Sequence, residues 1–425
     1  MATVTTGAAA LGPIYARAAG ESTLRDRLTQ APADATGLAF ARVDDVAQKT
    51  AFVSVDATLP APGSIRGYPT WIHEINTPDL ASLDGAGGNG RVDTRIVWRD
   101  GACAHLVLVA GHCPEAAGDA IMSSRTTSGG YGWRLGSRVR LTATTVDVLG
   151  PDGAVQVGAP LHIVGIYRPQ NISDPFWFGR NYFIAHPYAG PFDGPDTIDT
   201  LFVDRSFWPT LSEPSDFHMY VDYPLDPTQI RLKDEPQLRQ SVVELAGHYV
   251  AAGPQDTTLT TSVTNTLDAA DRERGQLNVS TILVTVQLAL LAWLVLYQVV
   301  ADAAEARGNE IALAKLRGFS AFATLRFGLG EPLTILALAI PLGLVAAWVG
   351  IGVMARIVLV PDTPVAPNLG ALGGALVGFA GGAVAAALAA RRTLTRPVLE
   401  QWRRVPQNVG PGLATFFFDL VVVAA

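Results

Sequence analysis

The sequence predicts an α-helical membrane protein that carries a large extracytoplasmic α+β domain. Three observations predict this fold class: residues 276–425 contain long stretches without a charge, residues 18–275 contain short strand-like runs between turn signals, and the two parts differ in charge. The first 275 residues hold 21 basic and 31 acidic side chains, a net of −10; the remainder holds ten basic and seven acidic ones, a net of +3. This division indicates an acidic region in water and a mildly basic unit in the membrane.

The overall composition of the 425 residues excludes several classes of protein. Only 16% are charged and 49% are hydrophobic, whereas disordered chains combine low hydrophobicity with high net charge. A net charge of −7 with three lysines offers no cationic surface for nucleic acid. No G-x-x-x-x-G-K-[ST] string is present, so the chain has no P-loop of its own for ATP, and no cofactor is expected.

Three stretches are long enough to span a bilayer. Residues 279–300, 332–355 and 365–390 comprise 22, 24 and 26 residues without a charge. A spanning helix needs about 20 predominantly apolar residues, and a buried helix of a soluble core is usually shorter. All three stretches are therefore predicted to be transmembrane helices.

The basic residues outside the spans predict the orientation. The 301–331 loop carries four Lys or Arg residues and the segment after the third span carries five, whereas the loop between the second and third spans has only Arg356. Because Lys and Arg concentrate in cytoplasmic loops, 301–331 and 391–412 are expected in the cytoplasm. Residues 18–275 are then expected on the outer side of a multi-pass cell-membrane protein.

Small residues recur at every fourth position of the third span. On a helix they form one stripe, which lets a second helix backbone approach closely and favours packing in lipid. The spacing leaves open whether the partner helix lies in the same chain or in another. The stripe consists of Gly370, Gly374, Gly378 and Gly382, continued by Ala386 and Ala390.

Apolar runs of 13 residues lie at both ends of the chain, at 2–14 and 413–425. Neither is long enough to span on its own, and no basic start of a secretory signal precedes Arg17. Residues 1–17 are therefore expected to end one truncated transmembrane helix and residues 413–425 to begin another. The chain would then be a fragment of a longer polytopic protein.

Residues 18–275 are rich in Gly, Pro and Asp turn signals with short apolar or alternating runs between them. Such runs are typical of β-strands, and the amphipathic stretches at 22–30 and 237–251 are typical of helices. The sum predicts an α+β domain with several β-hairpins. The predicted strands are 95–98, 105–109, 139–148, 161–167 and 200–203.

Cys103 and Cys113 are the only cysteines. On the outer side of a membrane a disulfide is the favoured interpretation, because the segment between them can fold back so that the two meet. A zinc site that adds His105 and His112 is the alternative, since two Cys and two His can bind zinc. The usual zinc spacing separates two ligand pairs by a longer insert, so the disulfide is preferred.

The remaining candidates in the outer region are given structural roles. Scattered acidic residues are interpreted as turn residues rather than catalysts, and the aromatic residues as packing residues rather than an exposed binding face. The acidic residues are Asp174, Asp204 and Asp222, and the aromatic ones are Trp177, Phe178 and Trp208.

The most informative segment lies in the 301–331 loop and reads RGNEIALAKLRGFS at 307–320. Acidic Glu310 near its start and basic Lys315 near its end suit a helix dipole, and Gly318 suits the position after a helix. A short amphipathic helix between spans lies on the membrane or docks on a partner protein, and its small basic content favours the partner. Its apolar side consists of Ile311, Ala314 and Leu316.

This segment resembles the R-x-x-E-[IV]-A-L-L-[RK]-x-[LR]-G signature of FtsX/MacB-like ABC transporter permeases. In that family the signature lies between two transmembrane helices and forms the coupling element that contacts the ATPase subunit. The resemblance implies the same role here, with Asn309 and Ala314 as departures and Leu316 on the apolar side. The matching residues are Arg307, Glu310, Ile311, Ala312, Leu313, Lys315 and Gly318.

The outer region adds to the likeness. The strings GHCPEAAGDAIMSS, WRLGSRVRL and LHIVGIYRP are similar to the MacB-type periplasmic core at Gly111 to Pro114, Leu135 to Leu141 and Val164 to Ile166. The strings GPIYARAAGESTLRDRL and FFFDL resemble actinobacterial members, which carry two such halves in one chain. The resemblance thus implies a MacB-like core at 18–275 and an FtsX-like permease domain at 276–412.

The resemblance implies a permease subunit that performs no catalysis itself. Its expected partners are a cytoplasmic ABC ATPase dimer, a second permease half or protomer, and membrane lipid, but no nucleic acid. Coupling to ATP hydrolysis would drive export of a lipid, lipoprotein or peptide. One alternative is mechanotransmission or sensing without transport, for control of a cell-wall hydrolase or a response to peptide antibiotics. Another class of function is a membrane-anchored enzyme or metal-binding ectodomain.

Overall fold

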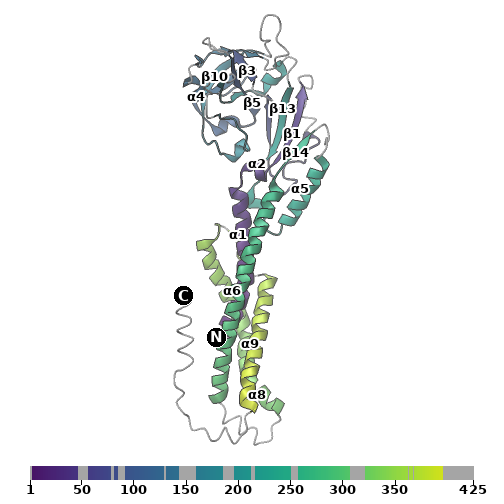
Figure 1. Ribbon diagram of the computed structural model, residues 1–425, viewed down its shortest axis with the longest axis vertical. Helices are drawn as coiled ribbons and strands as arrows, with labels where there is room; N and C mark the ends of the chain where they lie inside the picture. Colours follow the sequence, from purple (N-terminus) through teal and green to yellow (C-terminus); the bar gives the residue numbers. More distant parts are fainter. Residues whose placement is uncertain are drawn as a thin grey trace. The chain divides into compact units, whose positions relative to one another are not determined.

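The computed structural model describes residues 2–45, 56–77, 81–84, 91–128, 131–142, 159–184, 196–211, 216–249, 257–306, 321–361, 363–366 and 368–395. The chain divides into two compact units. Thr23–Glu273 form the sheet unit, and Met1–Ser22 with Arg274–Ala425 form the helical unit. The division falls within two helices, α1 (Ala2–Gln30) and α6 (Val263–Ala306), drawn in Figure 1.

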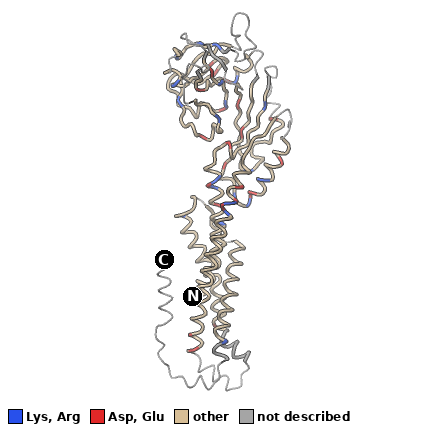
Figure 2. The backbone as a smooth tube through the Cα atoms, viewed as in Figure 1, with Lys and Arg blue, Asp and Glu red and all other residues tan. Residues whose placement is uncertain are grey.

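The helical unit contains α8 (Ala321–Val358) and α9 (Leu369–Thr395) together with the first part of α1 and most of α6. Within the described residues, three helical segments are long and apolar enough to cross a membrane: Val263–Ala306, Gly330–Val358 and Leu369–Arg391. Figure 2 shows how few charged residues these helices carry along most of their length. They contain the predicted spans, except that the third begins later than residue 365.

The later start of α9 has a local cause. Ala366 stands before a proline in the sequence, and the residue before a proline is disfavoured in helical conformation. Asn368 then caps the helix, because its side-chain oxygen accepts a hydrogen bond from the backbone N–H of Ala371 at 2.7 Å. The predicted span at 365–390 is therefore corrected to a helix that begins at Leu369.

The helices of the helical unit pack through small residues. Alanines of α1, α8 and α9 meet in one apolar cluster, and α6, α8 and α9 meet in a second. Small side chains let helices approach closely where lipid provides no hydrophobic driving force. The first cluster contains Ala10, Ile14, Ala18, Ala347, Ile351, Ala371 and Ala375; the second contains Leu296, Val300, Leu336, Ala386, Ala389 and Ala390.

The sheet unit is built on a ten-stranded mixed sheet in the order β14-β1-β13-β2-β5-β12-β7-β10-β6, with β8 paired to β10. The pairs β12–β5 and β10–β7 are parallel and the others are antiparallel. Its strands are β1 (Leu38–Asp45), β2 (Ile72–Asn76), β5 (Ile96–Arg99), β6 (Leu106–Gly111), β7 (Asp119–Ser123), β8 (Arg138–Val139), β10 (Leu161–Pro169), β12 (Leu201–Val203), β13 (Asp216–Tyr223) and β14 (Thr258–Thr260).

A second sheet has the order β11-β4-β3-β9 within the described residues. The described part of the sheet unit also holds three shorter α-helices, of which α5 is the longest and contacts β14 (Figure 1). The strands are β3 (Ala81–Asp84), β4 (Arg91–Thr94), β9 (Leu141–Thr142) and β11 (Asp196–Thr197), and the helices are α2 (Ala33–Thr36), α4 (Ser124–Ser128) and α5 (Glu235–Tyr249).

Most of the strands and helices predicted for this region are confirmed. The runs at 95–98, 161–167 and 200–203 form β5, β10 and β12, and the amphipathic stretch at 237–251 forms α5. The run at 105–109 forms β6, although its first residue ends a 3₁₀ turn, Ala102–His105. The run at 139–148 is broken into β8 and β9, and residues 143–148 lie outside the described part.

The main core of the sheet unit lies between the sheet and its helices. Leu24 and Leu28 from α1, Val242 from α5 and Leu267 from α6 are all buried against sheet residues such as Phe40. A fully buried leucine or phenylalanine side chain contributes about 1.5–3 kcal/mol through the hydrophobic effect. The ends of α1 and α6 are therefore part of this core.

Candidate functional site

The predicted coupling residues lie outside the part of the chain that the structure describes. This segment runs from 307 to 320, so it includes Arg307, Glu310, Ile311, Ala312, Leu313, Lys315, Leu316 and Gly318. The structure does place its flanks, since α6 ends at Ala306 and α8 begins at Ala321. The coupling role of these residues therefore remains a prediction.

The small-residue stripe of α9 lies against α1 of the same chain. A Cβ atom at Gly378 would be 3.0 Å from both the Thr5 carbonyl oxygen and the Ala9 Cβ, and one at Gly374 would overlap the Ala9 carbonyl. Real Cβ atoms rarely or never make contacts this short, so a larger residue would force the two helices to shift. Gly370 faces Pro13 in the same way, at 3.3 Å.

The fourth glycine of the stripe faces other helices. A Cβ at Gly382 would be 3.0 Å from Leu336 of α8 and 3.1 Å from Leu296 of α6. One turn earlier, the indole N–H of Trp293 on α6 donates a hydrogen bond of 3.2 Å to the carbonyl oxygen of Gly378. The stripe therefore joins α9 to three other helices of the helical unit.

The role of α1 is larger than the sequence indicated. Residues 2–17 belong to a 29-residue helix that continues to Gln30. Its Thr6 hydroxyl donates to the Ala339 carbonyl of α8 at 3.0 Å, and its Pro13 carbonyl accepts from the Asn368 amide at 3.2 Å. The signal that could have revealed this packing is the helical four-residue spacing of Thr6, Ala10 and Ile14.

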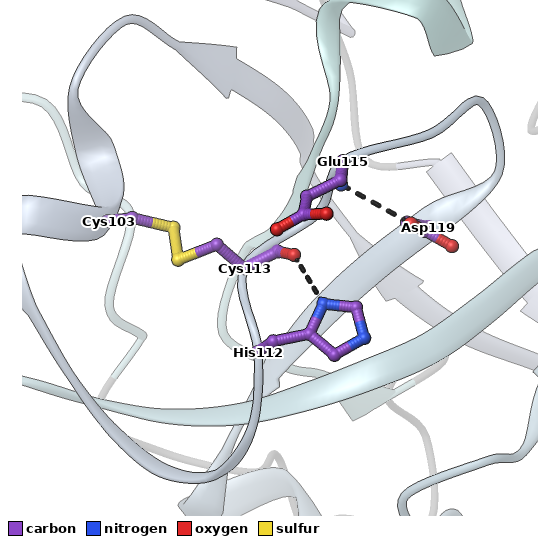
Figure 3. Close-up of a disulfide and its surroundings, with 5 residues drawn as sticks. All are labelled: Cys103, His112, Cys113, Glu115 and Asp119. Carbon is purple, nitrogen blue, oxygen red and sulfur yellow. Dashed lines mark hydrogen bonds between the residues drawn. A yellow bond between two sulfur atoms is a disulfide. The ribbon is translucent and has the colours of Figure 1, made fainter.

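Cys103 and Cys113 form a disulfide that brackets β6 (Figure 3). The two histidines of the zinc alternative have other contacts. His112 Nδ1 hydrogen-bonds the Cys113 carbonyl oxygen at 2.8 Å, whereas His105 Nδ1 lies 3.0 Å from Asp174 and stacks on the Phe176 ring. Within the described residues, no group of three or more His, Cys, Asp or Glu side chains could hold a metal ion.

The strings that carry the outer-region resemblance meet at one place on the sheet. Gly111 pairs with Gly165 in the β6–β10 ladder, and the His112 N–H donates to the Val164 carbonyl at 3.1 Å. Gly111 has a φ of +78°, a conformation that favours glycine, and a Cβ there would overlap the Val164 carbonyl. Gly136, in the turn before β8, donates to the Ile163 carbonyl at 2.8 Å.

A buried ion-pair network in the sheet unit was missed by the sequence interpretation. Asp222 is not a turn residue: it lies in β13, fully buried, and its Oδ2 is 2.8 Å from Arg99 Nη1. The same guanidinium lies 2.6 Å from Glu74 Oε2. Arg180 pairs with both carboxylates, and the Tyr182 hydroxyl donates to Glu74.

This network links three adjacent strands to a loop. Glu74, Arg99 and Asp222 lie on β2, β5 and β13, while Arg180 and Tyr182 follow the 3₁₀ turn at Pro175–Trp177. The alternation of polar and apolar residues in a strand does not show whether a charged side chain is exposed to water or is buried against an oppositely charged side chain of another strand. The one available signal was Asp222 inside the run FHMYVDY, where alternation places it on the same face as Tyr220.

The charges fix the protonation of the buried acid and phenol. Burial by itself would raise the pKa of the Glu74 carboxyl, but the Arg180 and Arg99 charges hold that pKa below its ordinary value of 4.5. Burial, reinforced by the charge of Glu74, raises the pKa of Tyr182, so its phenol stays protonated and donates. The arrangement is a closed set of partners, which suits a structural role.

The other structural interpretations agree with the contacts. Asp174 and Asp204 each accept a hydrogen bond from a backbone N–H two residues later and cap 3₁₀ turns. The three aromatic residues are buried, with exposures of 1%, 3% and 5% for Trp177, Phe178 and Trp208. These aromatic residues therefore do not form an exposed binding face.

Comparisons with known proteins give structural likenesses at low identity. No model of a protein family matches the chain, and no curated protein matches it. Among solved structures, a domain of a protein named as a permease from Porphyromonas gingivalis is 12% identical, with a TM-score of 0.26, over 52% of this chain and 88% of that one. The periplasmic region of MacB from Actinobacillus actinomycetemcomitans is 10% identical, with a TM-score of 0.30, over 56% of this chain and 93% of that one. Both scores are low, so a functional proposal depends on this chain's own residues.

Proposed function

We propose that the chain is the membrane subunit of an FtsX/MacB-like ABC system. In this proposal a separate cytoplasmic ATPase hydrolyses ATP, and the segment at 307–320 receives its motion. The chain contributes no catalytic group of its own. Three features support the proposal: the apolar helices, the basic loop at 301–331 that predicts a cytoplasmic location, and the RGNEIALAKLRG string.

The observation that carries the proposal is the continuity of α6. The helix runs without interruption from Val263 to Ala306, and Ala306 is directly followed by Arg307 of the coupling string. At about 1.5 Å per residue, 44 helical residues span about 66 Å. The first turns of this helix, with Val263 and Leu267, therefore belong to the core of the sheet unit, and its last described residue directly precedes the proposed ATPase contact.

The first turns of α6 are tied to their neighbours by ion pairs as well as by apolar packing. Arg239 of α5 lies 3.0 Å from Asp271 and also pairs with Asp268. Arg27 of α1 lies 2.7 Å from Glu273. These partly exposed ion pairs add to the buried apolar packing that joins α6 to α1 and α5.

The coupling contact is tested by Leu316→Asp, with Asn309→Asp as the matched control. Both variants add one negative charge to the same segment, but Leu316 belongs to the apolar side and Asn309 departs from the family signature. We expect Leu316→Asp to abolish co-purification of the ATPase that accompanies the wild-type chain from host membranes, while Asn309→Asp retains it. Normal recovery of the ATPase with a membrane-inserted Leu316→Asp chain would reject the assignment.

The two outcomes of the motion are separated by a transport assay. The chain and its ATPase, reconstituted in vesicles, would move a labelled lipid, lipoprotein or peptide in an ATP-dependent manner if the system exports its substrate. ATP hydrolysis that responds to the outer ligand without movement of a label would identify mechanotransmission instead. Export is the first expectation because the three apolar helices suit a bilayer, where such a substrate would be taken up.

A further inference from the structure

A groove lies at one end of α8, entirely within the helical unit. Its volume is about 650 Å³, and its walls come from the last turns of α8 and from the segment that leads to α9. The helix side consists of Trp348, Val349, Gly352, Val353 and Arg356, which share one face of α8 by their three- and four-residue spacing. The segment side includes Leu359, Val360 and Val365.

The segment is fixed in place, so the groove is a formed feature. The Trp348 indole N–H donates to the Val365 carbonyl at 3.0 Å, and the Val360 N–H donates to the Ser22 hydroxyl at 3.0 Å. Leu359 and Val365 pack against the alanine-rich cluster of α1, α8 and α9. These contacts anchor the segment side of the groove at both of its ends.

Among the described residues of the walls, most side chains are apolar and Arg356 carries the only charge. Val349 and Val353 are 53% and 57% exposed, and Trp348 is 45% exposed. Arg356 is exposed, and within the described residues it has no ion-pair partner. In the sequence it is the only Lys or Arg between Arg326 and Arg391.

The groove lies where a lipid would meet these groups. Gly330–Val358 is apolar enough to cross a membrane, and an arginine near the end of such a helix is typical of the headgroup level, whereas Trp348, about two turns deeper than Arg356, lies at the depth of the acyl chains. Arg356 lies eight residues beyond Trp348, which is about 12 Å along the helix. That distance fits a phosphate beside the guanidinium with the upper part of an acyl chain beneath it.

We propose that this groove binds an anionic phospholipid of the surrounding bilayer, with its phosphate at Arg356 and one acyl chain along Trp348, Val349, Gly352 and Val353. The orientation expected from the basic loops assigns the site to the outer leaflet. The proposal depends on α8 crossing the membrane and not on ATPase coupling, so each proposal can fail separately. A purely structural Arg356 would only complement the C-terminal dipole of α8, and it would not discriminate between lipids.

The test uses the full chain in detergent, titrated separately with brominated phosphatidylglycerol, brominated phosphatidylcholine and inorganic phosphate. Bromine quenches nearby tryptophan, and Trp348→Phe identifies the part of the quenching that comes from the groove. We expect saturable quenching. The lipid concentration that gives half-maximal quenching (the half-point) should be about fivefold lower for phosphatidylglycerol than for phosphatidylcholine, because one arginine attracts the anionic headgroup. Arg356→Gln should remove this preference, and Arg356→Lys should keep most of it.

A filled groove provides the second variant. Nothing lies within 4 Å of a Cβ built at Gly352 or at Gly350, so both accept a side chain, but only Gly352 lines the groove. Gly352→Leu should abolish the Trp348 quenching, while Gly350→Leu should behave as wild type. Equal half-points for the two lipids, unchanged quenching in Gly352→Leu, or displacement of the lipid by inorganic phosphate alone would each overturn the proposal.

Discussion

At the scale of single residues, the buried charges of the sheet unit depend on one another. Glu74, Arg99 and Asp222 are completely or almost completely removed from solvent, and each has an oppositely charged neighbour. Removing two charges from water costs several kcal/mol per ion, and only the paired geometry offsets this cost. Removing one partner therefore lowers the free energy of unfolding by more than the intact pair raises it.

Arg99→Met should destabilise the chain strongly. The change leaves Glu74 and Asp222 with less compensation in the interior, and breaking a buried pair costs about 3–5 kcal/mol. Arg27→Met is the matched control, because Arg27 and Glu273 are 48% and 40% exposed, and water and salt screen such a pair so that it contributes little to stability. Urea unfolding of the purified chain, followed by tryptophan fluorescence, measures both. Equal losses in the two variants would contradict the buried network.

Acid should weaken the sheet unit partly through Glu74. The pKa of this carboxyl is depressed in the fold, so its contribution to stability is complete above about pH 5 and is lost as the pH falls through the folded-state pKa below 4.5. Glu74→Gln cannot take up this proton, so its unfolding midpoint should fall less between about pH 5 and pH 3. Glu244→Gln, on the exposed face of α5, should follow the wild-type fall. A wild-type-like fall in Glu74→Gln would assign the acid sensitivity to other carboxyls.

At the scale of elements, α9 is shaped by what it packs against. Its glycines at 374 and 378 allow the α1 backbone to approach at Thr5 and Ala9, whereas Gly373 on the same helix faces open space. Glycine costs about 1 kcal/mol relative to alanine inside a helix. At 378 that cost is offset by close packing, and at 373 nothing within the described residues offsets it.

Gly378→Leu should therefore destabilise the helical unit, while Gly373→Leu should leave it unchanged or slightly more stable. Overpacking costs about 1–3 kcal/mol, and the gain in helix propensity favours the control. Thermal unfolding in detergent, followed by the helical circular dichroism signal, measures the difference. If both variants unfold at the same temperature, α9 does not require α1 at this position.

The elements that the sequence predicted well are those with a local signal. The charge-free stretches indicated the spans, and apolar runs indicated β5, β10 and β12. The start of α9 was misplaced because Asn368 acts as a cap only once the chain turns there. The extent of α1 was missed because Arg17 ends the apolar run without ending the helix. The buried ion-pair network around Arg99 was not predicted, because its members lie on three strands that are far apart in sequence.

At the scale of the whole molecule, the two units have opposite requirements for solvent. The sheet unit pairs its most deeply buried charges, and the helical unit exposes large apolar side chains such as Ile282, Leu338 and Ile357. Exposed apolar residues in such numbers would aggregate in water, and lipid is the solvent that suits them. The coupling segment at 307–320 carries the functional prediction from sequence alone, because it lies outside the described residues.

The predicted orientation can be read by labelling two engineered cysteines in intact cells. Ser64→Cys and Ala303→Cys occupy exposed positions in the sheet unit and near the end of α6. The native pair is already in a disulfide, so it gives no background. A membrane-impermeant maleimide should label position 64 in intact cells and position 303 only after permeabilisation. Labelling of position 303 in intact cells would reverse the topology.

The sheet order has a consequence for biosynthesis. β1 pairs with β13 on one side and with β14 on the other, so the earliest strand of the sheet waits for two of the latest. The 171 positions from Asp45 to Asp216 take roughly 9–34 s to synthesise at about 5–20 residues per second. During that interval β1 has been synthesised without its partners, so the sheet unit completes its fold only after nearly all of its chain has been made. A chaperone that holds β1 until β13 and β14 have been synthesised would suit this chain.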